Sequence, residues 1–175
     1  MPQETVLSKL DYEELLNRKI KHWGIEGKTR GRSGNEKEFC LFLDKEISYI
    51  LSKSGCKFTN IAKEFLLKDY GRIDYLIKTS NGQFLIIEVK HSNSSKKGNS
   101  DTKFIAGIGQ LLGYKTILSS IYKIPFEKIK LALFIDIDSL RTLAVINSHN
   151  LGIDVYVVGS NSVKIYKNNG QTNKI

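Results

Sequence analysis

The pattern of apolar and polar positions along the chain predicts helices that alternate with strands. Apolar residues recur at helical spacing over residues 8–23, about Glu36–Ser52 and about Lys103–Tyr122. Shorter apolar runs predict strands near Gly71–Lys78, Gln83–Lys90, Lys130–Asp136 and Ile153–Val158. Three further segments are a helix at Asp138–Asn150, an ambiguous strand at Ile61–Leu67 and an edge strand at Val163–Lys167. This order predicts an α/β fold in which a central mixed sheet is flanked by helices.

Two of the strands should form a hairpin that brings two acids together. Gly71–Lys78 and Gln83–Lys90 are joined by the turn sequence Ser80-Asn81-Gly82. Asp74 and Glu88 lie at similar distances from that turn, so they should be cross-strand neighbours. Like charges in that position repel each other, and a divalent cation between them would remove the repulsion. The alternative is that Asp74 is an ordinary exposed acid near a turn.

The strand that carries Glu88 is apolar on both faces, which is typical of a central strand. Because side chains alternate along a strand, Glu88 and Lys90 share the face of Phe84 and Ile86. A carboxylate and an ammonium group therefore lie together where the strand leaves the core. They could form a functional site, or they could simply reach water at the strand end.

Glu36 is a third candidate acid. It lies in angle within the apolar stripe of the helix predicted at about Glu36–Ser52, whereas Glu38 points to the opposite side. Ser33-Gly34-Asn35-Glu36 also fits a capping box, in which the glutamate binds the start of its own helix. Both roles stay open at this point.

Gln110 and Tyr114 are four residues apart and share one face of a predicted helix. Gly107, Gly109 and Gly113 interrupt the same helix at a cost of about 1 kcal/mol each relative to alanine. A close approach to the strands or to a ligand would explain these glycines. The alternative is that Gln110 and Tyr114 are ordinary polar residues on a packed helix.

The formal net charge is +9 and the sequence pI is about 9.4, which favours a polyanionic partner such as nucleic acid. Residues 18–32 hold six basic residues and one acid, and a second basic stretch runs from Lys90 to Lys103. A lysine-rich solvated surface is the alternative. The candidate nucleic-acid contacts are Lys28, Arg30, Arg32, Lys96, Lys97 and Lys103.

Other residue types add little chemistry. Cys40 and Cys56 are interpreted as small apolar residues and not as a zinc site. His91 directly follows Lys90 and could touch phosphate, but it is interpreted as an exposed loop residue. No apolar run reaches the roughly eighteen residues of a membrane helix, and residues 1–10 lack a signal sequence, so we expect a cytoplasmic protein and no membrane contact. We expect a single globular unit, with an N-terminal helix and basic loop at 1–32 and the main domain at 33–170.

The ordered set of these residues resembles the PD-(D/E)xK nuclease superfamily, which includes restriction endonucleases and archaeal Holliday-junction resolvases. The matching positions are Glu36, Gly71 with Asp74, Glu88 with Lys90, and Gln110 with Tyr114. Ile73 stands where the name pattern has proline. The resemblance covers about residues 33–122, and the later elements through Val158 also suit the family's αβββαβ core.

The resemblance implies a restriction-endonuclease-like fold and a magnesium-dependent nuclease, in which manganese could replace magnesium. Asp74 and Glu88 would hold the metal, with the Val89 carbonyl and Glu36 as further ligands. Lys90 would orient the attacking water and stabilise charge on the phosphate. Gln110 and Tyr114 would position the site or the nucleic-acid backbone.

The resemblance leaves several substrates open. DNA is the expected partner, with structure- or end-directed cleavage as in a junction resolvase or an exonuclease. A restriction-type endonuclease, RNA as the substrate, and a non-cleaving binding module with the same fold are the alternatives. A resolvase would act as a homodimer, because it cuts two strands related by symmetry.

Overall fold

The computed structural model describes residues 34–92, 100–159, 162–168 and 172–175. The helix predicted at 8–23 and the basic loop that follows it lie outside these residues. The described elements are α2 (Gly34–Lys53), β1 (Phe58–Leu67), β2 (Gly71–Thr79), β3 (Phe84–Lys90), α3 (Ser100–Ser120), the 3-10 turn η1 (Phe126–Lys128), β4 (Ile129–Ile135), α4 (Leu140–Ser148), β5 (Ile153–Val158), β6 (Val163–Tyr166) and β7 (Thr172–Lys174).

The strands form one mixed sheet of seven strands, in which the spatial order follows the sequence order. The pairs β1–β2 and β2–β3 are antiparallel, and β3–β4 and β4–β5 are parallel. The last two pairs, β5–β6 and β6–β7, are antiparallel again. Each of the two parallel connections carries a helix, as a crossover requires. The sequence α2-β1-β2-β3-α3-β4 is the αβββαβ order, so the expected fold class is confirmed.

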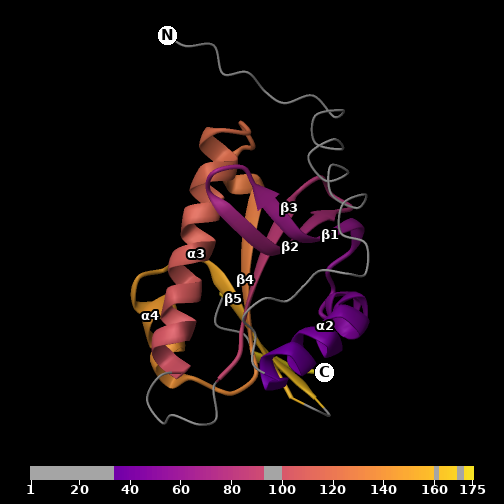
Figure 1. The fold of residues 1–175 in the computed structure, drawn as a ribbon, viewed down its shortest axis with the longest axis vertical. Coiled ribbons are helices and arrows are strands. Elements are labelled where there is room, and N and C mark those ends of the chain that lie inside the picture. The colour runs from indigo at the N-terminus through magenta and orange to yellow at the C-terminus, as the bar shows by residue number, and fades with distance from the viewer. Residues whose placement is uncertain (1–33, 93–99, 160–161, 169–171) are drawn as a thin grey trace.

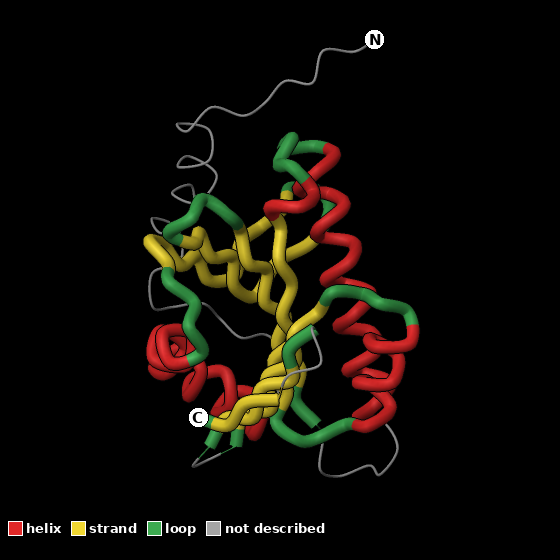
Figure 2. Tube along the Cα trace, turned by 180° about the vertical axis from the view of Figure 1, so that it is seen from behind, coloured by secondary structure: helices red, strands yellow, loops and turns green. Residues whose placement is uncertain are grey.

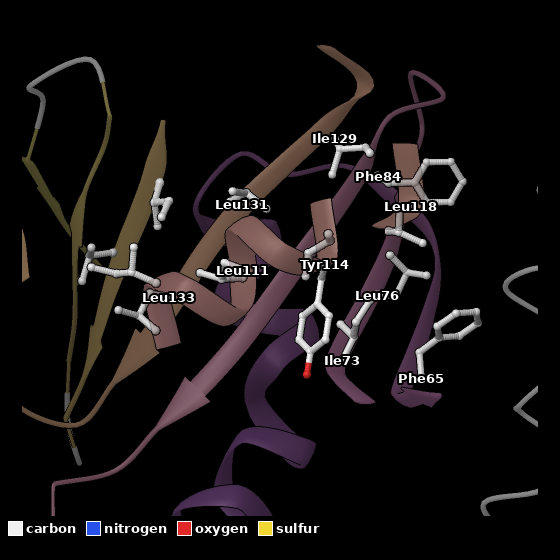
Figure 3. Close-up of a cluster of buried hydrophobic side chains, with 14 of the residues drawn as sticks. Phe65, Ile73, Leu76, Phe84, Leu111, Tyr114, Leu118, Ile129, Leu131 and Leu133 are labelled. Atoms are coloured by element: carbon white, nitrogen blue, oxygen red, sulfur yellow. The ribbon is translucent and has the colours of Figure 1, made fainter. Parts of the chain in front are cut away.

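Helices cover both faces of the sheet, with α2 on one side and α3 and α4 on the other (Figures 1 and 2). Alternating residues of β3 divide between two apolar layers. Phe84 and Ile86 pack with residues of α3, whereas Leu85 and Ile87 pack with residues of α2. Figure 3 shows the α3 layer, where Leu111, Tyr114 and Leu118 project onto the strands. The central position of β3 explains its continuous apolar sequence.

Helix α2 follows from its apolar stripe, because Leu43, Ile47, Ile50 and Leu51 are all buried against the sheet. Its bounds agree with the predicted helix to within two residues. None of the helices in the described ranges is long and apolar enough to cross a membrane.

Two strands differ from the sequence prediction. The ambiguous segment Ile61–Leu67 belongs to a longer strand, β1, which begins at Phe58. The segment expected as an edge strand, β6, pairs on both sides, because the chain turns back to add β7 at the edge. Only three residues form β7, and a pattern that short gives no periodicity to detect.

Candidate functional site

Asp74 and Glu88 lie on neighbouring strands at the open end of the β2–β3 hairpin. Pairing between the strands runs from Lys78↔Phe84 to Tyr75↔Ile87, and the next step of this register opposes Asp74 to Glu88. The Val89 N–H donates a hydrogen bond to Asp74 Oδ2 at 2.7 Å. The register therefore places the two acids opposite each other on neighbouring strands, and the Asp74 side chain ties the strands just beyond their last backbone pair.

Glu88 is a buried acid with a cationic partner. Its side chain is only 3% exposed, and Lys90 Nζ lies 2.7 Å from its Oε1. Removing a carboxylate from water costs several kcal/mol (roughly, after relaxation), which a close ammonium group offsets. The Lys90 side chain is 23% exposed, so the ion pair extends from the core to the surface. A strand end that simply reached water would not bury its acid in this way.

Helix α3 passes close to Lys90 because it has a glycine at the crossing point. A Cβ on Gly107 would lie 3.0 Å from Lys90 Cγ and 3.0 Å from Leu133 Cδ1. The glycines of this helix predicted that it passes close to the strands, and Gly107 confirms this prediction. A Cβ on Gly109 or Gly113 would meet nothing within 4 Å, so packing does not explain these two.

Tyr114 connects α3 to the start of β2. Its hydroxyl donates to the Arg72 carbonyl at 2.8 Å, and its ring lies over Gly71, which has a φ of +119°. Burial, and then the negative charge of Glu88, raise the pKa of Tyr114, and the nearby Gln110 side chain acts in the opposite direction. Figure 3 shows the Tyr114 hydroxyl near Ile73, pointing out of the apolar cluster. Tyr114 thus fixes the backbone two residues before Asp74.

Glu36 belongs to the first turn of α2, but its side chain lies outside the described part of the structure. Cys40, one helical turn later, lines a cavity of about 10 Å³ together with Asp74 and Val89.

The described acids offer a limited set of metal donors. Within the described ranges, no three His, Cys, Asp or Glu side chains gather closely enough to hold a metal ion. Asp74 and Glu88 form a pair of hard oxygen donors, which suits magnesium, because this ion uses one or two carboxylates and retains several waters. The donor chemistry therefore fits magnesium.

One of the six predicted nucleic-acid contacts, Lys103, lies within the described residues. Lys28, Arg30, Arg32, Lys96 and Lys97 lie outside the described residues. Lys103 is partly exposed in the first turn of α3, one turn before Gly107.

Sequence reasoning missed a cluster beside Lys90. The interpretation of His91 as an exposed loop residue is wrong, because its side chain is only 13% exposed and its Nε2 lies 3.2 Å from Asp136 Oδ2. The Ser92 N–H donates to Asp136 Oδ1 at 2.7 Å, and the His91 ring packs on Phe39. These contacts fix the chain directly after β3. They depend on the β3–β4 pairing, whose last pair is Lys90↔Ile135.

Glu64 is a second residue that the sequence did not single out. The β1–β2 register flanks it with the pairs Lys63↔Tyr75 and Phe65↔Ile73, which opposes Glu64 to Asp74. Its φ of +49° is unusual for a glutamate in a strand, and such backbone strain is often found at functional sites. Its Oε2 lies 3.8 Å from Arg72 Nη1, and it also lines the small cavity beside Asp74.

Comparisons with known proteins give two structural likenesses. No family model matches the chain, and no curated protein matches it. A repair endonuclease from Pyrococcus abyssi aligns with a TM-score of 0.45 and 13% identity, over 66% of this chain and 46% of that one. EndoMS in complex with double-stranded DNA aligns with a TM-score of 0.43 and 16% identity, over 63% of this chain and 42% of that one. The chain spans less than half the length of either aligned protein.

Proposed function

We propose that this chain is a metal-dependent deoxyribonuclease of the PD-(D/E)xK type, with Asp74, Glu88 and Lys90 at its centre. The observation that carries the proposal is the buried Glu88–Lys90 pair beside Asp74, at the end of a central strand. A buried ion pair is weak evidence for stability, because apolar residues of similar volume often do as well. Its position beside a second carboxylate favours a catalytic explanation.

Magnesium would be held by Asp74 and Glu88, with the Val89 carbonyl and Glu36 as further ligands, and manganese could replace it. When bound, the metal supplies Lewis-acid polarisation of the phosphate and a more acidic water. The protein holds these donors in place: the Val89 N–H fixes one oxygen of Asp74, and burial fixes Glu88. Glu36 is included because it stands one turn before Cys40, which lines the small cavity beside Asp74.

Lys90 would stabilise the negative charge that builds on the phosphate as water attacks phosphorus and the bond to the leaving oxygen breaks. Its aliphatic chain lies against α3 at Gly107, so few rotamers remain open to it. Its ammonium group is partly shielded from water beside the buried Glu88 carboxylate, where electrostatic interactions are stronger than in water. Gln110 and Tyr114 are positioning residues, since Tyr114 holds the Arg72 carbonyl.

DNA is the proposed substrate, with cleavage directed by DNA structure or by strand ends. The net charge of +9 favours a polyanion, and contacts to phosphate provide affinity without sequence information. The alternatives are a restriction-type enzyme, a nuclease that cleaves RNA, and a protein that binds without cleavage. One cleavage assay distinguishes all three.

The test is cleavage of linear, circular, single-stranded, flap and four-way-junction DNA, and of RNA, with magnesium, manganese or EDTA. Asp74→Asn should lose cleavage and keep DNA binding, because asparagine retains an oxygen that can accept from the Val89 N–H. Asp69→Asn is the matched control, since Asp69 is exposed in the turn between β1 and β2. Salt-sensitive binding with no cleavage under any metal would contradict the nuclease and favour a binding module.

A further inference from the structure

We propose that a second site, on the opposite face and at the opposite end of the sheet from Glu88, binds the phosphomonoester group of a nucleotide or of a DNA strand end. The site is a cavity of about 470 Å³, within the range of small-ligand pockets. Its charged lining residues are Lys57, Lys130, Lys167 and Asp154. We call it the lysine pocket. The inference does not depend on the nuclease proposal.

The sheet register separates the lysine pocket from Glu88. Lys130 pairs with Leu85 near the start of β3, whereas Glu88 lies near its end. Leu85 and Tyr156 belong to the apolar layer beneath α2, and Glu88 lies on the other face of the same strand, the face covered by α3. A ligand in the lysine pocket would therefore not touch the candidate active site.

The charge of the lysine pocket favours a dianion. Its lining holds three lysines and one aspartate, which leaves two positive charges. A phosphomonoester carries about −1.5 to −2 charges at neutral pH, so it matches this excess. Burial raises the pKa of the Cys56 thiol, which therefore stays neutral and adds no negative charge.

The single acid of the pocket is already used by internal contacts. Asp154 Oδ2 lies 3.3 Å from Lys167 Nζ, and its Oδ1 accepts from the Asn168 N–H at 2.8 Å. Lys167 Nζ also lies 3.4 Å from the Tyr156 hydroxyl, which donates to Ser54. This network fixes one wall of the pocket.

Lys57 and Lys130 supply the charge that remains. Both are exposed, and among the described residues neither forms an ion pair. They come from the α2–β1 connection and from the start of β4, so the fold has brought together lysines that are distant in sequence. A bound anion would neutralise the charge that these two lysines bring together.

Polar groups of the β2–β3 turn could orient the ligand. Thr79, Asn81 and Gln83 line the pocket and hydrogen bond to one another, with Thr79 Oγ1 donating to Asn81 Oδ1 at 2.5 Å. Lysines bind phosphate as point charges, whereas side-chain amides and hydroxyls add direction.

The test is calorimetric titration of the full chain in EDTA with inorganic phosphate, AMP, and an oligonucleotide with either a 5′-phosphate or a 5′-hydroxyl. The Lys57→Gln/Lys130→Gln double variant should weaken phosphate and AMP binding by at least about tenfold, because two charge-assisted contacts are lost. Lys123→Gln/Lys128→Gln removes the same charge outside the lining and should bind like the parent. Asp154→Asn should tighten binding, since it frees Lys167 from its acid.

The oligonucleotide arms identify the source of the phosphate. Binding of the 5′-phosphate form alone, lost in the pocket variant, would support a strand end as a ligand, whereas binding of AMP alone would support a free nucleotide. Equal binding of the two oligonucleotides with no binding of phosphate or AMP would overturn the proposal in favour of general backbone attraction. Equal weakening by both double variants, or no binding of any probe, would also overturn it. Loss of DNA cleavage plays no part in these readouts.

Discussion

Asp74 Oδ2 accepts a hydrogen bond from the Val89 N–H at 2.7 Å, so an acidic side chain ties β2 to β3 just beyond their last backbone pair, Tyr75↔Ile87. A backbone carbonyl would be the ordinary partner of a strand N–H. The contact fixes the position of Asp74 relative to Glu88 and Lys90. The carboxylate therefore takes part in the hydrogen bonding of the sheet and is not an ordinary exposed side chain.

Lys90 and a bound cation should compete for Glu88, because Lys90 Nζ already lies 2.7 Å from Glu88 Oε1. We expect Lys90→Met to lower cleavage by about 100- to 1,000-fold, as loss of a charge-stabilising donor does. The variant should also be destabilised in EDTA, since a buried carboxylate loses its partner. Magnesium should therefore raise the melting temperature of Lys90→Met more than that of the parent.

Lys68→Met is the control for Lys90, because Lys68 is exposed in the turn after β1. Equal magnesium-induced shifts in the parent and in Lys90→Met would show that the metal does not share Glu88 with Lys90.

Gly107 and Gly109 provide a matched pair on one helix. Gly107→Ala would place a Cβ 3.0 Å from both Lys90 Cγ and Leu133 Cδ1, so Lys90 must shift. We expect this variant to lose cleavage. Gly109→Ala meets nothing within 4 Å and should stabilise the fold by about 0.4–1 kcal/mol, through better helix propensity and a less flexible unfolded chain. Urea unfolding and cleavage rates of both variants test the pair, and equal activities would contradict the role given to Lys90.

Tyr114→Phe removes the hydrogen bond to the Arg72 carbonyl, which should cost about 0.5–1.5 kcal/mol of unfolding free energy. Because Tyr114 positions β2 near Asp74, kcat should fall by about 10- to 100-fold, the range seen for residues behind a metal site, while KM stays unchanged. Tyr122→Phe, a partly buried tyrosine just after α3, should leave both constants unchanged. A rise in KM alone would instead indicate that the hydroxyl contacts the nucleic acid.

The hairpin could be predicted from the sequence because its geometry is local. The turn at Asn81-Gly82 sets the register, and Gly82 has the φ of +77° that the turn requires. Asp74, Glu88 and Lys90 all lie within this one unit. The sequence also predicted that α3 passes close to the strands, because glycines are unfavourable inside a helix unless packing requires them. It did not predict that Lys90 is the residue that contacts Gly107.

The rest of the site depends on contacts between distant segments. His91 meets Asp136 only because β3 pairs with β4 in one particular register, and no local pattern fixes that register. Glu64 was hidden in a segment whose periodicity did not separate helix from strand. The lysine pocket joins residues from Gly55 to Lys167, and a sequence pattern has no signal for such a convergence. Burial of His91 likewise depends on Phe39 of α2.

Tyr75 should make the fold sensitive to alkaline pH. Its side chain is buried and donates to Asp44, and burial followed by this hydrogen bond raises the pKa of Tyr75 well above its usual value. A tyrosine with a raised folded-state pKa contributes stability that is complete below the unfolded pKa of about 10 and is lost as pH rises above it. We expect the unfolding free energy of the parent to fall, relative to Tyr75→Phe, by about 1.4 kcal/mol per pH unit above about pH 10.

Urea unfolding of the parent and of Tyr75→Phe between about pH 9 and about pH 11 measures this difference. The difference between the two unfolding free energies does not contain the contributions of the lysines and Tyr114, because these groups titrate in both proteins. Tyr49→Phe is the control, since Tyr49 is 59% exposed and should give no pH-dependent difference. A constant difference between the parent and Tyr75→Phe across this range would mean that the Tyr75 hydroxyl ionises as easily in the folded protein as in the unfolded chain. Its contact with Asp44 would then not be maintained in solution.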